Sequence, residues 1–308
     1  MKRAKLLLCC ALAICKLASS PDCGIAAGPL NLPSATGLSP GDVLFNDFFN
    51  GWIKFEPSSN QLFSLPWARQ SGGNNGLELD RDGAILTTDI RNSVLRIHPV
   101  TGAATPITPI PSSTTGFEVL LDGDFLFYGA TGSASRNGDI WTGGRNNLFV
   151  RYDRDAQTIS PLPKPEQFVP GNVVIGHGGE VYVDEFFRGV QRIDLMTGEM
   201  TNNPQTNLGF RELLGVFPNG DLAVYSVFDG IGRLNLATGS QTWVSDRLFP
   251  LREAAMDEDG NFWAVVQSSL LLVNGETGEV SERLPNTSFF SPRSMLVIPS
   301  DWTPPPVP

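Results

Sequence analysis

The chain has 308 residues, of which 41% are hydrophobic and 18% are charged, and its net charge at pH 7 is −10. The acidic balance argues against duplex nucleic acid and anionic membrane surfaces as partners, because both repel a negatively charged protein. Gly and Pro contribute 32 and 24 residues and Lys only five, a turn-rich composition that argues against a helical bundle, a coiled coil and a disordered chain.

Residues 1–20 have the layout of a secretory signal peptide. Lys2, Arg3 and Lys5 precede an apolar run over residues 6–15, and small residues follow that run. The run is too short to span a bilayer, although an N-terminal membrane anchor is the alternative interpretation. Cleavage after residue 20 would remove four cations and no acid, so that the mature net charge would be −14. We therefore expect a secreted or periplasmic protein whose mature chain has no transmembrane span.

Two segments outside the expected domain are rich in Pro. Residues 21–40 combine Pro and Gly with small residues and lack hydrophobic periodicity, which predicts a linker. Cys23 in this linker would be the only cysteine left after cleavage, so we expect no internal disulfide. Residues 303–308, TPPPVP, predict an extended tail. The ordered domain is expected between residues 41 and 302.

An internal repeat runs through this domain. Each unit contains an apolar strand, a turn that ends in Gly, two further strands and a Thr-Gly turn before a fourth strand. The first-turn glycines Gly179, Gly220 and Gly260 are 41 and 40 residues apart. Asx-Gly and Gly-Gly turns tolerate positive φ and match the twist of the strands they join, so the repeat predicts consecutive antiparallel hairpins.

One unit is longer than the others, because Gly83 and Gly179 are 96 residues apart. Its first turn falls at either Asp122-Gly123 or Asn137-Gly138, and extra residues are expected around 123–136. An insertion rich in Gly, Ser and Asn is also a place where function can reside.

The two chain ends together supply a sixth unit. Residues 43–47 and 52–57 match a second and a third strand, and the missing first strand appears at residues 294–298. Pairing of this C-terminal strand with the N-terminal unit would close the ring. We predict an all-β protein, a monomeric six-bladed β-propeller with four-stranded antiparallel blades. A stacked solenoid is the alternative, but it would need caps rather than a closing strand.

The second unit resembles a known group of propellers. Residues 76–83 (GLELDRDG), Asp89 and residues 94–102 (VLRIHPVTG) are similar to blades of the NHL-repeat and SMP-30/gluconolactonase-like superfamily. The resemblance covers nearly all of residues 41–299. It implies the six-bladed architecture but not one function, because this fold hosts lactonases, lyases, synthases and binding proteins.

The resemblance carries little of the lactonase metal site. Lactonases of that family have a metal-binding Glu in a Glu-Gly-Pro stretch, an Asn in an Asn-Gly-hydrophobic stretch and a late Asp. Asn75, in Asn75-Gly76-Leu77, is the one residue here that matches this pattern. The chain contains no Glu-Gly-Pro, and Arg252 stands at the position of the late Asp.

Ligands of such propellers are expected at the mouth of the central channel, on the face opposite the Asx-Gly and Thr-Gly turns. His98 and His177 both belong to those turns, which disfavours a Ser-His-Asp triad or a His-bound metal. Lys54 and Lys164 are the only lysines after cleavage, and Lys54 lies on a third strand away from the channel. Schiff-base chemistry therefore has no good candidate.

The side chains expected at the mouth are mostly acidic, amide or aromatic. Carboxylate and amide oxygens from separated segments are the ligands that Ca²⁺ prefers. The candidate metal ligands are Asn75, Asp89, Asp184 and Glu212. The alternative is a structural role, in which the repeated Asp after each second strand bonds to amides of its own loop.

Two similar loops, NDFFNG and DEFFRG, suggest a contact surface for a partner or an apolar ligand. The candidate binding residues at the mouth are Asp47, Phe48, Phe49, Glu185, Phe186, Phe187, Arg252 and Arg293. Packing of the Phe side chains between blades is the alternative interpretation.

Two functional hypotheses follow. The first is an exported propeller that binds a protein or a small ligand at the channel mouth without catalysis. The second is a calcium-dependent lactonase or hydrolase of the SMP-30 kind. Convergence of at least three oxygen-bearing side chains on the channel axis would favour the second hypothesis, whereas Arg252 or Arg293 in the channel would favour an anionic ligand.

Overall fold

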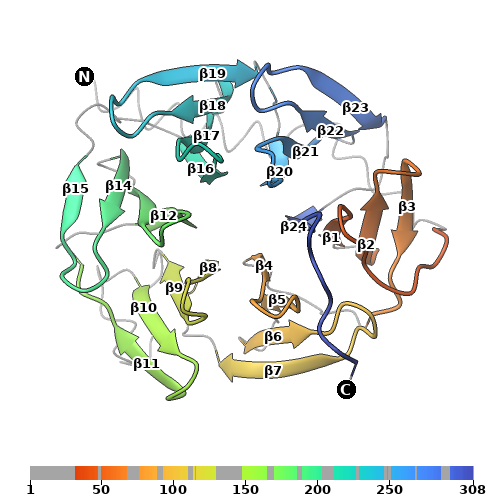
Figure 1. Ribbon diagram of the computed structural model, residues 1–308, viewed down its shortest axis with the longest axis horizontal. Coiled ribbons are helices and arrows are strands. Elements are labelled where there is room, and N and C mark those ends of the chain that lie inside the picture. Colours follow the sequence, from red (N-terminus) through yellow and green to blue (C-terminus); the bar gives the residue numbers. More distant parts are fainter. Residues whose placement is uncertain are drawn as a thin grey trace, which may run out of the picture.

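The computed structural model describes residues 32–47, 50–67, 76–88, 93–109, 114, 116–129, 148–164, 170–185, 189–202, 211–226, 229–245, 248, 251–267, 269–285 and 292–307. Figure 1 shows six four-stranded antiparallel sheets arranged around a central axis as the blades of a propeller. The predicted fold class is confirmed. None of the described residues forms a helix, and so none forms one that could cross a membrane.

The first three blades are formed as follows. Blade 1 contains β24 (Pro292–Val297), β1 (Val43–Asp47), β2 (Gly51–Glu56) and β3 (Gln61–Ser64). Blade 2 contains β4 (Leu77–Leu79), β5 (Ile85–Thr88), β6 (Ser93–Ile97) and β7 (Ala104–Pro109). Blade 3 contains β8 (Gly116–Val119), β9 (Phe125–Gly129), β10 (Leu148–Asp153) and β11 (Thr158–Pro161).

The remaining three blades follow in chain order. Blade 4 contains β12 (Pro170–Ile175), β13 (Val181–Glu185), β14 (Gly189–Ile193) and β15 (Met200–Asn202). Blade 5 contains β16 (Arg211–Val216), β17 (Leu222–Ser226), β18 (Gly230–Leu234) and β19 (Gln241–Ser245). Blade 6 contains β20 (Leu251–Met256), β21 (Phe262–Val266), β22 (Ser269–Val273) and β23 (Val280–Leu284).

The ring closes through blade 1, as the sequence predicts. The C-terminal strand β24 pairs antiparallel with β1, and Val43 lies opposite Val297. The first and the last described strands are thereby held in one sheet, whose inner strand β24 faces the channel like the first strand of every other blade.

The hydrophobic core lies between neighbouring blades. Phe45 and Phe55 of blade 1 pack in one cluster with Trp263 and Val265 of blade 6, and the rings of Phe55 and Trp263 are 5.4 Å apart. A single sheet buries little apolar surface, so each blade depends on its two neighbours for stability. This dependence is the physical reason why closure of the ring matters.

The turns between the first and second strands have the predicted chemistry. Gly83 has a φ of +86° and donates its backbone N–H to the carbonyl of Asp80 at 2.9 Å. Such a φ favours Gly, because other residues place Cβ in a strained position. The Thr-Gly turn of blade 4 is capped by Asp194, whose Oδ1 accepts hydrogen bonds from the backbone of Met196 and Thr197.

The structure corrects one boundary in blade 3. Its first turn is at Asp122-Gly123, where Gly123 donates to the carbonyl of Leu120 at 2.8 Å. The second strand β9 therefore occupies Phe125–Gly129, a stretch that we expected to belong to the insertion. The expected position of the insertion was wrong there, because the sequence left two Asx-Gly pairs open as the first turn and both fit the repeat. Residues 130–147, which include Asn137-Gly138, lie outside the described residues.

Both segments that flank the predicted domain contact the propeller where they are described. Ala35 donates to the carbonyl of Ser64 at 3.0 Å, and the buried Leu38 donates to the carbonyl of Pro99. Residues 21–31, including Cys23, lie outside the described residues.

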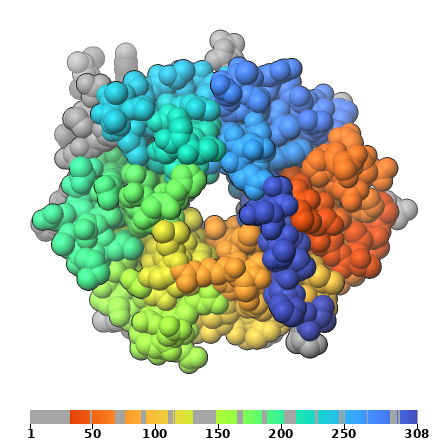
Figure 2. All heavy atoms as spheres, in the orientation of Figure 1, coloured from red at the N-terminus to blue at the C-terminus, as the bar shows by residue number. Residues whose placement is uncertain are grey.

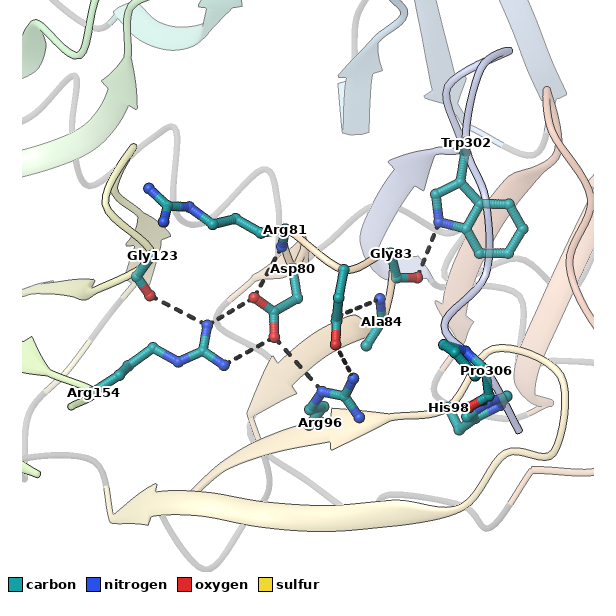
Figure 3. Close-up of polar contacts among 11 residues, drawn as sticks. Asp80, Arg81, Gly83, Ala84, Arg96, His98, Gly123, Arg154, Trp302 and Pro306 are labelled. Atoms are coloured by element: carbon teal, nitrogen blue, oxygen red, sulfur yellow. Dashed lines mark hydrogen bonds and ion pairs between the residues drawn. The ribbon is translucent and has the colours of Figure 1, made fainter. Parts of the chain in front are cut away.

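The C-terminal tail runs over the face that carries the Asx-Gly turns, next to blade 2 (Figures 1 and 3). The indole N–H of the buried Trp302 donates to the carbonyl of Gly83 at 2.9 Å. Farther along the tail, the carbonyl of Pro306 lies 3.3 Å from Nε2 of His98. The imidazole Nδ1 of His98 accepts from two backbone N–H groups of its own turn, so Nε2 is the donor to Pro306.

Candidate functional site

The central channel forms a cavity in the propeller. It has a volume of about 820 Å³ and is lined mainly by residues of the innermost strands, β4, β8, β12, β16, β20 and β24. Figure 2 shows its opening at the centre of the ring, on the face that carries the C-terminal tail. Among the lining residues that the structure describes, four are glutamates and Arg252 is the only cation. The four glutamates are Glu78, Glu118, Glu212 and Glu253.

Glu78 and Glu118 form one pair on neighbouring blades. Glu78 of β4 lies opposite Leu86, and Glu118 of β8 lies opposite Leu126. Leu86 is the third residue after the turn glycine Gly83, and Leu126 is the third after the turn glycine Gly123. The two glutamates therefore lie at the same level of the channel.

Glu212 and Glu253 form the second pair, on blades 5 and 6. Glu212 of β16 lies opposite Tyr225, and Glu253 of β20 lies opposite Val265. Tyr225 is the fifth residue after the turn glycine Gly220, and Val265 is the fifth after Gly260. This pair of glutamates therefore lies two residues farther from the turn face than the first pair. Both β16 and β20 contain a register shift beside the glutamate, and such bulges re-aim side chains.

The first pair lies in an environment that favours neutral carboxyl groups. Burial raises the pKa of Glu78 to about 8. Burial, and secondly the charge of Glu78, hold the pKa of Glu118 well above its usual range. The hydroxyl of Tyr128 donates to Oε1 of Glu118 at 3.3 Å. At neutral pH the empty channel therefore holds at least one of these carboxyls in its protonated form.

The environment of the second pair also raises the pKa values of its carboxyl groups. Burial raises the pKa of Glu253 to about 8, with the charge of Glu212 as the second cause. Desolvation also raises the pKa of Glu212, although this side chain is exposed within the channel. The hydroxyl of Tyr225 points elsewhere, since it donates to the carbonyl of Leu248 at 3.1 Å.

The structure places the predicted metal ligands as follows. Glu212 lines the channel on β16, whereas Asp184 lies near the end of β13, the second strand of blade 4. Asn75 and Asp89 lie outside the described residues. In the part of the chain that is described, no three His, Cys, Asp or Glu side chains are grouped closely enough to hold a metal ion. The calcium site therefore stays a prediction.

The predicted binding surface is described only in part. Arg252 is exposed and lines the channel. Asp47 is buried, and its Oδ1 accepts hydrogen bonds from the backbone and the side chain of Asn50 at 2.9 and 2.8 Å. These bonds within its own loop are of the kind that a structural role of Asp47 predicts, and its role in ligand binding stays a prediction. The side chains of Phe48, Phe49, Glu185, Phe186, Phe187 and Arg293 lie outside the described residues.

The histidines and Lys54 lie where the sequence places them. His98 and His177 both belong to turns, and Nε2 of His177 lies 3.1 Å from the carbonyl of Phe217 in the next blade. Lys54 is buried on β2, the third strand of its blade, and forms an ion pair of 2.8 Å with Asp42.

Sequence reasoning missed Glu78, Glu118 and Glu253, because it searched loops rather than strand interiors. A signal was present in Leu77-Glu78-Leu79 and Phe117-Glu118-Val119, where a charge stands between two apolar residues of a first strand. Side chains alternate across a strand, so each glutamate lies on the opposite sheet face from its two apolar neighbours. Both faces of a blade pack against other blades, and the position of the first strand beside the channel brings these glutamates into the channel lining.

Comparison with known proteins supports the fold. No family model and no curated protein matches this sequence. Virginiamycin B lyase from Staphylococcus aureus is 18% identical, with a TM-score of 0.50 over 72% of this chain and 73% of that chain. A gluconolactonase from Xanthomonas campestris is 12% identical, with a TM-score of 0.56 over 82% and 87%. A chain of the nidogen/laminin complex is 15% identical, with a TM-score of 0.59 over 84% and 98%. The resemblance to NHL- and SMP-30-like propellers is thereby confirmed at the level of fold.

Proposed function

We propose that this protein is an exported binding protein that takes a small organic cation into its central channel. One observation carries the proposal: four glutamates and a single arginine are the charged side chains described along the channel wall. An opposite charge close to a carboxyl favours its ionised form. A bound cation would therefore offset the desolvation that makes these carboxyls hard to ionise in the empty channel.

The size and composition of the channel agree with a small-molecule ligand. Its volume of about 820 Å³ falls within the range of roughly 300–1,000 Å³ that is usual for such sites. Arg252 alone would favour an anion, as we expected for an arginine in the channel. The excess of glutamates over Arg252 reverses that preference.

Export is the second part of the proposal and rests on residues 1–20. Mass spectrometry of the protein recovered from the medium or the periplasm would test it. We expect a chain that begins near residue 21, and an uncleaved chain retained with the membrane would support the N-terminal anchor instead.

Calorimetry on chelator-treated protein tests the ligand class and includes the calcium-dependent lactonase as an outcome. Butylamine, butane-1,4-diamine and calcium chloride are titrated separately at pH 8. We expect saturable binding of at least one amine and loss of that binding in the double variant Glu78→Gln/Glu253→Gln. Glu276→Gln, at an exposed turn of blade 6, is the matched control. Calcium binding without amine binding would support the lactonase, and no amine binding at millimolar concentration would reject our proposal.

A further inference from the structure

We propose that the ligand of the channel is a linear diamine, with one ammonium group held by each of the two glutamate pairs. This inference rests on the function proposed above and adds the chemical class of the ligand.

The glutamates form two separate sites rather than one ring. Glu78 and Glu118 lie on β4 and β8, and these strands face β16 and β20, which carry Glu212 and Glu253, across the centre of the ring (Figure 1). In the described ranges, no three acidic side chains are grouped closely enough to share one metal ion. Two separated pairs of carboxyl groups suit two separated positive charges.

The two pairs also lie at different depths. Glu78 and Glu118 each lie opposite the third residue after the turn glycine of their blade. Glu212 and Glu253 each lie opposite the fifth. Two residues of a β-strand correspond to about 7 Å. A ligand that reaches both pairs must therefore extend along the channel as well as across it, which a flexible alkyl chain does and a compact ion does not.

Part of the channel lining is apolar and can accept an alkyl chain. Half-buried apolar side chains line the same cavity, namely Val119, Val174, Leu214, Met256 and Leu296. Methylene groups packed against them would leave water, and each buried CH₂ favours binding.

Glu78 is the group whose environment points most directly to a ligand. Its carboxyl group lines the cavity and is desolvated, yet it forms no hydrogen bond with any described residue. Glu78 is only partly buried, so its carboxyl is open to a ligand or water in the channel, and a desolvated polar group gains from such a partner. An ammonium group with three donors would satisfy Glu78 and Glu118 together.

Binding of a diamine should release protons, because it favours ionised carboxylates. The titratable groups that face Glu78 are Glu118 and Tyr128, and those near Glu253 are Glu212 and Arg252. Titration of the diamine in buffers of different ionisation enthalpy counts the protons released. We expect at least one proton per diamine at pH 7.

Calorimetry with matched amines tests the inference. Butane-1,4-diamine and hexane-1,6-diamine are compared with butylamine and hexylamine, so that chain length is held constant while one charge is removed. We expect one diamine per chain and an affinity at least tenfold above that of the matched monoamine, because the second contact is intramolecular.

Single substitutions at each pair complete the test. Glu78→Gln and Glu212→Gln should each lower diamine affinity at least tenfold while monoamine affinity falls less than threefold, because the other pair still holds one ammonium group. Gln resembles a protonated carboxyl in shape, so these variants should fold, and the melting temperature checks this. Equal affinity for diamine and monoamine would overturn the diamine inference and leave the proposed function standing. Absence of binding by every amine would overturn both.

Discussion

Arg154 of blade 3 holds the buried carboxylate of Asp80 in blade 2 through two hydrogen bonds, of 2.7 and 3.0 Å (Figure 3). Nε of Arg96, which belongs to the same blade as Asp80, lies 3.7 Å from the same carboxylate. The side chain of Asp80 is only 3% exposed, so its charge depends on these guanidinium groups. The pair joins two blades at the turn face, whereas the apolar clusters join them in the interior.

Asp80→Asn should destabilise the propeller clearly. The substitution removes the charge between two partly exposed guanidinium groups, and a hydrogen bond to a charged group is worth about 1.5–3 kcal/mol. Asp82→Asn is the matched control, because Asp82 is half exposed and its ion pair with Arg96 is a surface pair worth at most about 1 kcal/mol. Urea denaturation at pH 7 measures both free energies of unfolding. Equal losses for the two variants would contradict a structural role for the Asp80–Arg154 pair.

Gly83 and Gly220 allow the contribution of the tail to be separated from backbone strain. Both have a positive φ, +86° and +85°, but a Cβ on Gly83 would lie 2.2 Å from the carbonyl oxygen of Thr303, whereas a Cβ on Gly220 meets nothing within 4 Å. We expect Gly220→Ala to cost about 1 kcal/mol from strain alone. Gly83→Ala should cost at least about 1 kcal/mol more, because the tail must move.

Removal of residues 302–308 checks the origin of that difference, because a Cβ on Gly83 would also lie 3.0 Å from Nε1 of Trp302. In the shortened chain, Gly83→Ala and Gly220→Ala should have the same effect on the melting temperature. A difference that persists without the tail would show that the two turns differ for another reason.

The sequence was sufficient to predict the ring, the number of blades and the closing strand, because turn glycines at a regular spacing mark each hairpin. It could not place the first turn of blade 3, since Asp122-Gly123 and Asn137-Gly138 satisfy the same local rule. It also could not predict which residues of the propeller the C-terminal tail contacts. Composition predicts an extended TPPPVP segment, but the contact of Trp302 with Gly83 depends on the three-dimensional arrangement of blade 2.

The candidate site was predictable only in part, for a related reason. Arg252 and Glu212 were recognised because they precede or begin a first strand, where functional residues are commonly found. Glu78, Glu118 and Glu253 lie inside strands, and a polar residue within a strand is usually exposed to solvent. Their burial results from the meeting of several blades around one channel, which no single repeat reveals.

Trp302 should anchor the C-terminal tail. Its side chain is buried, and its indole N–H donates to the carbonyl of Gly83 (Figure 3). Replacing a buried Trp by Ala costs about 3 kcal/mol. We therefore expect Trp302→Ala to lower the melting temperature by roughly 6–12 °C, since 1 kcal/mol corresponds to about 2–4 °C in a domain of this size. Val307→Ala, at an exposed position of the same tail, should leave the melting temperature unchanged. If both variants melted like the parent protein, the tail would not contribute to stability.

The stability of the empty propeller should fall as pH rises through the neutral range. Glu78 has a folded-state pKa of about 8 and an ordinary value of 4.5. Below pH 4.5 the carboxyl is protonated in both states, and between the two values the unfolded chain loses a proton that the folded protein retains. Stability therefore decreases with rising pH between about 5 and 8, by at most about 1.4 kcal/mol per pH unit for each such carboxyl. Glu78→Gln should flatten this dependence, whereas Glu276→Gln should not. Calorimetric melting temperatures at pH 5, 6, 7 and 8 measure the slopes, and an unchanged slope in Glu78→Gln would show that Glu78 already ionises in the folded channel.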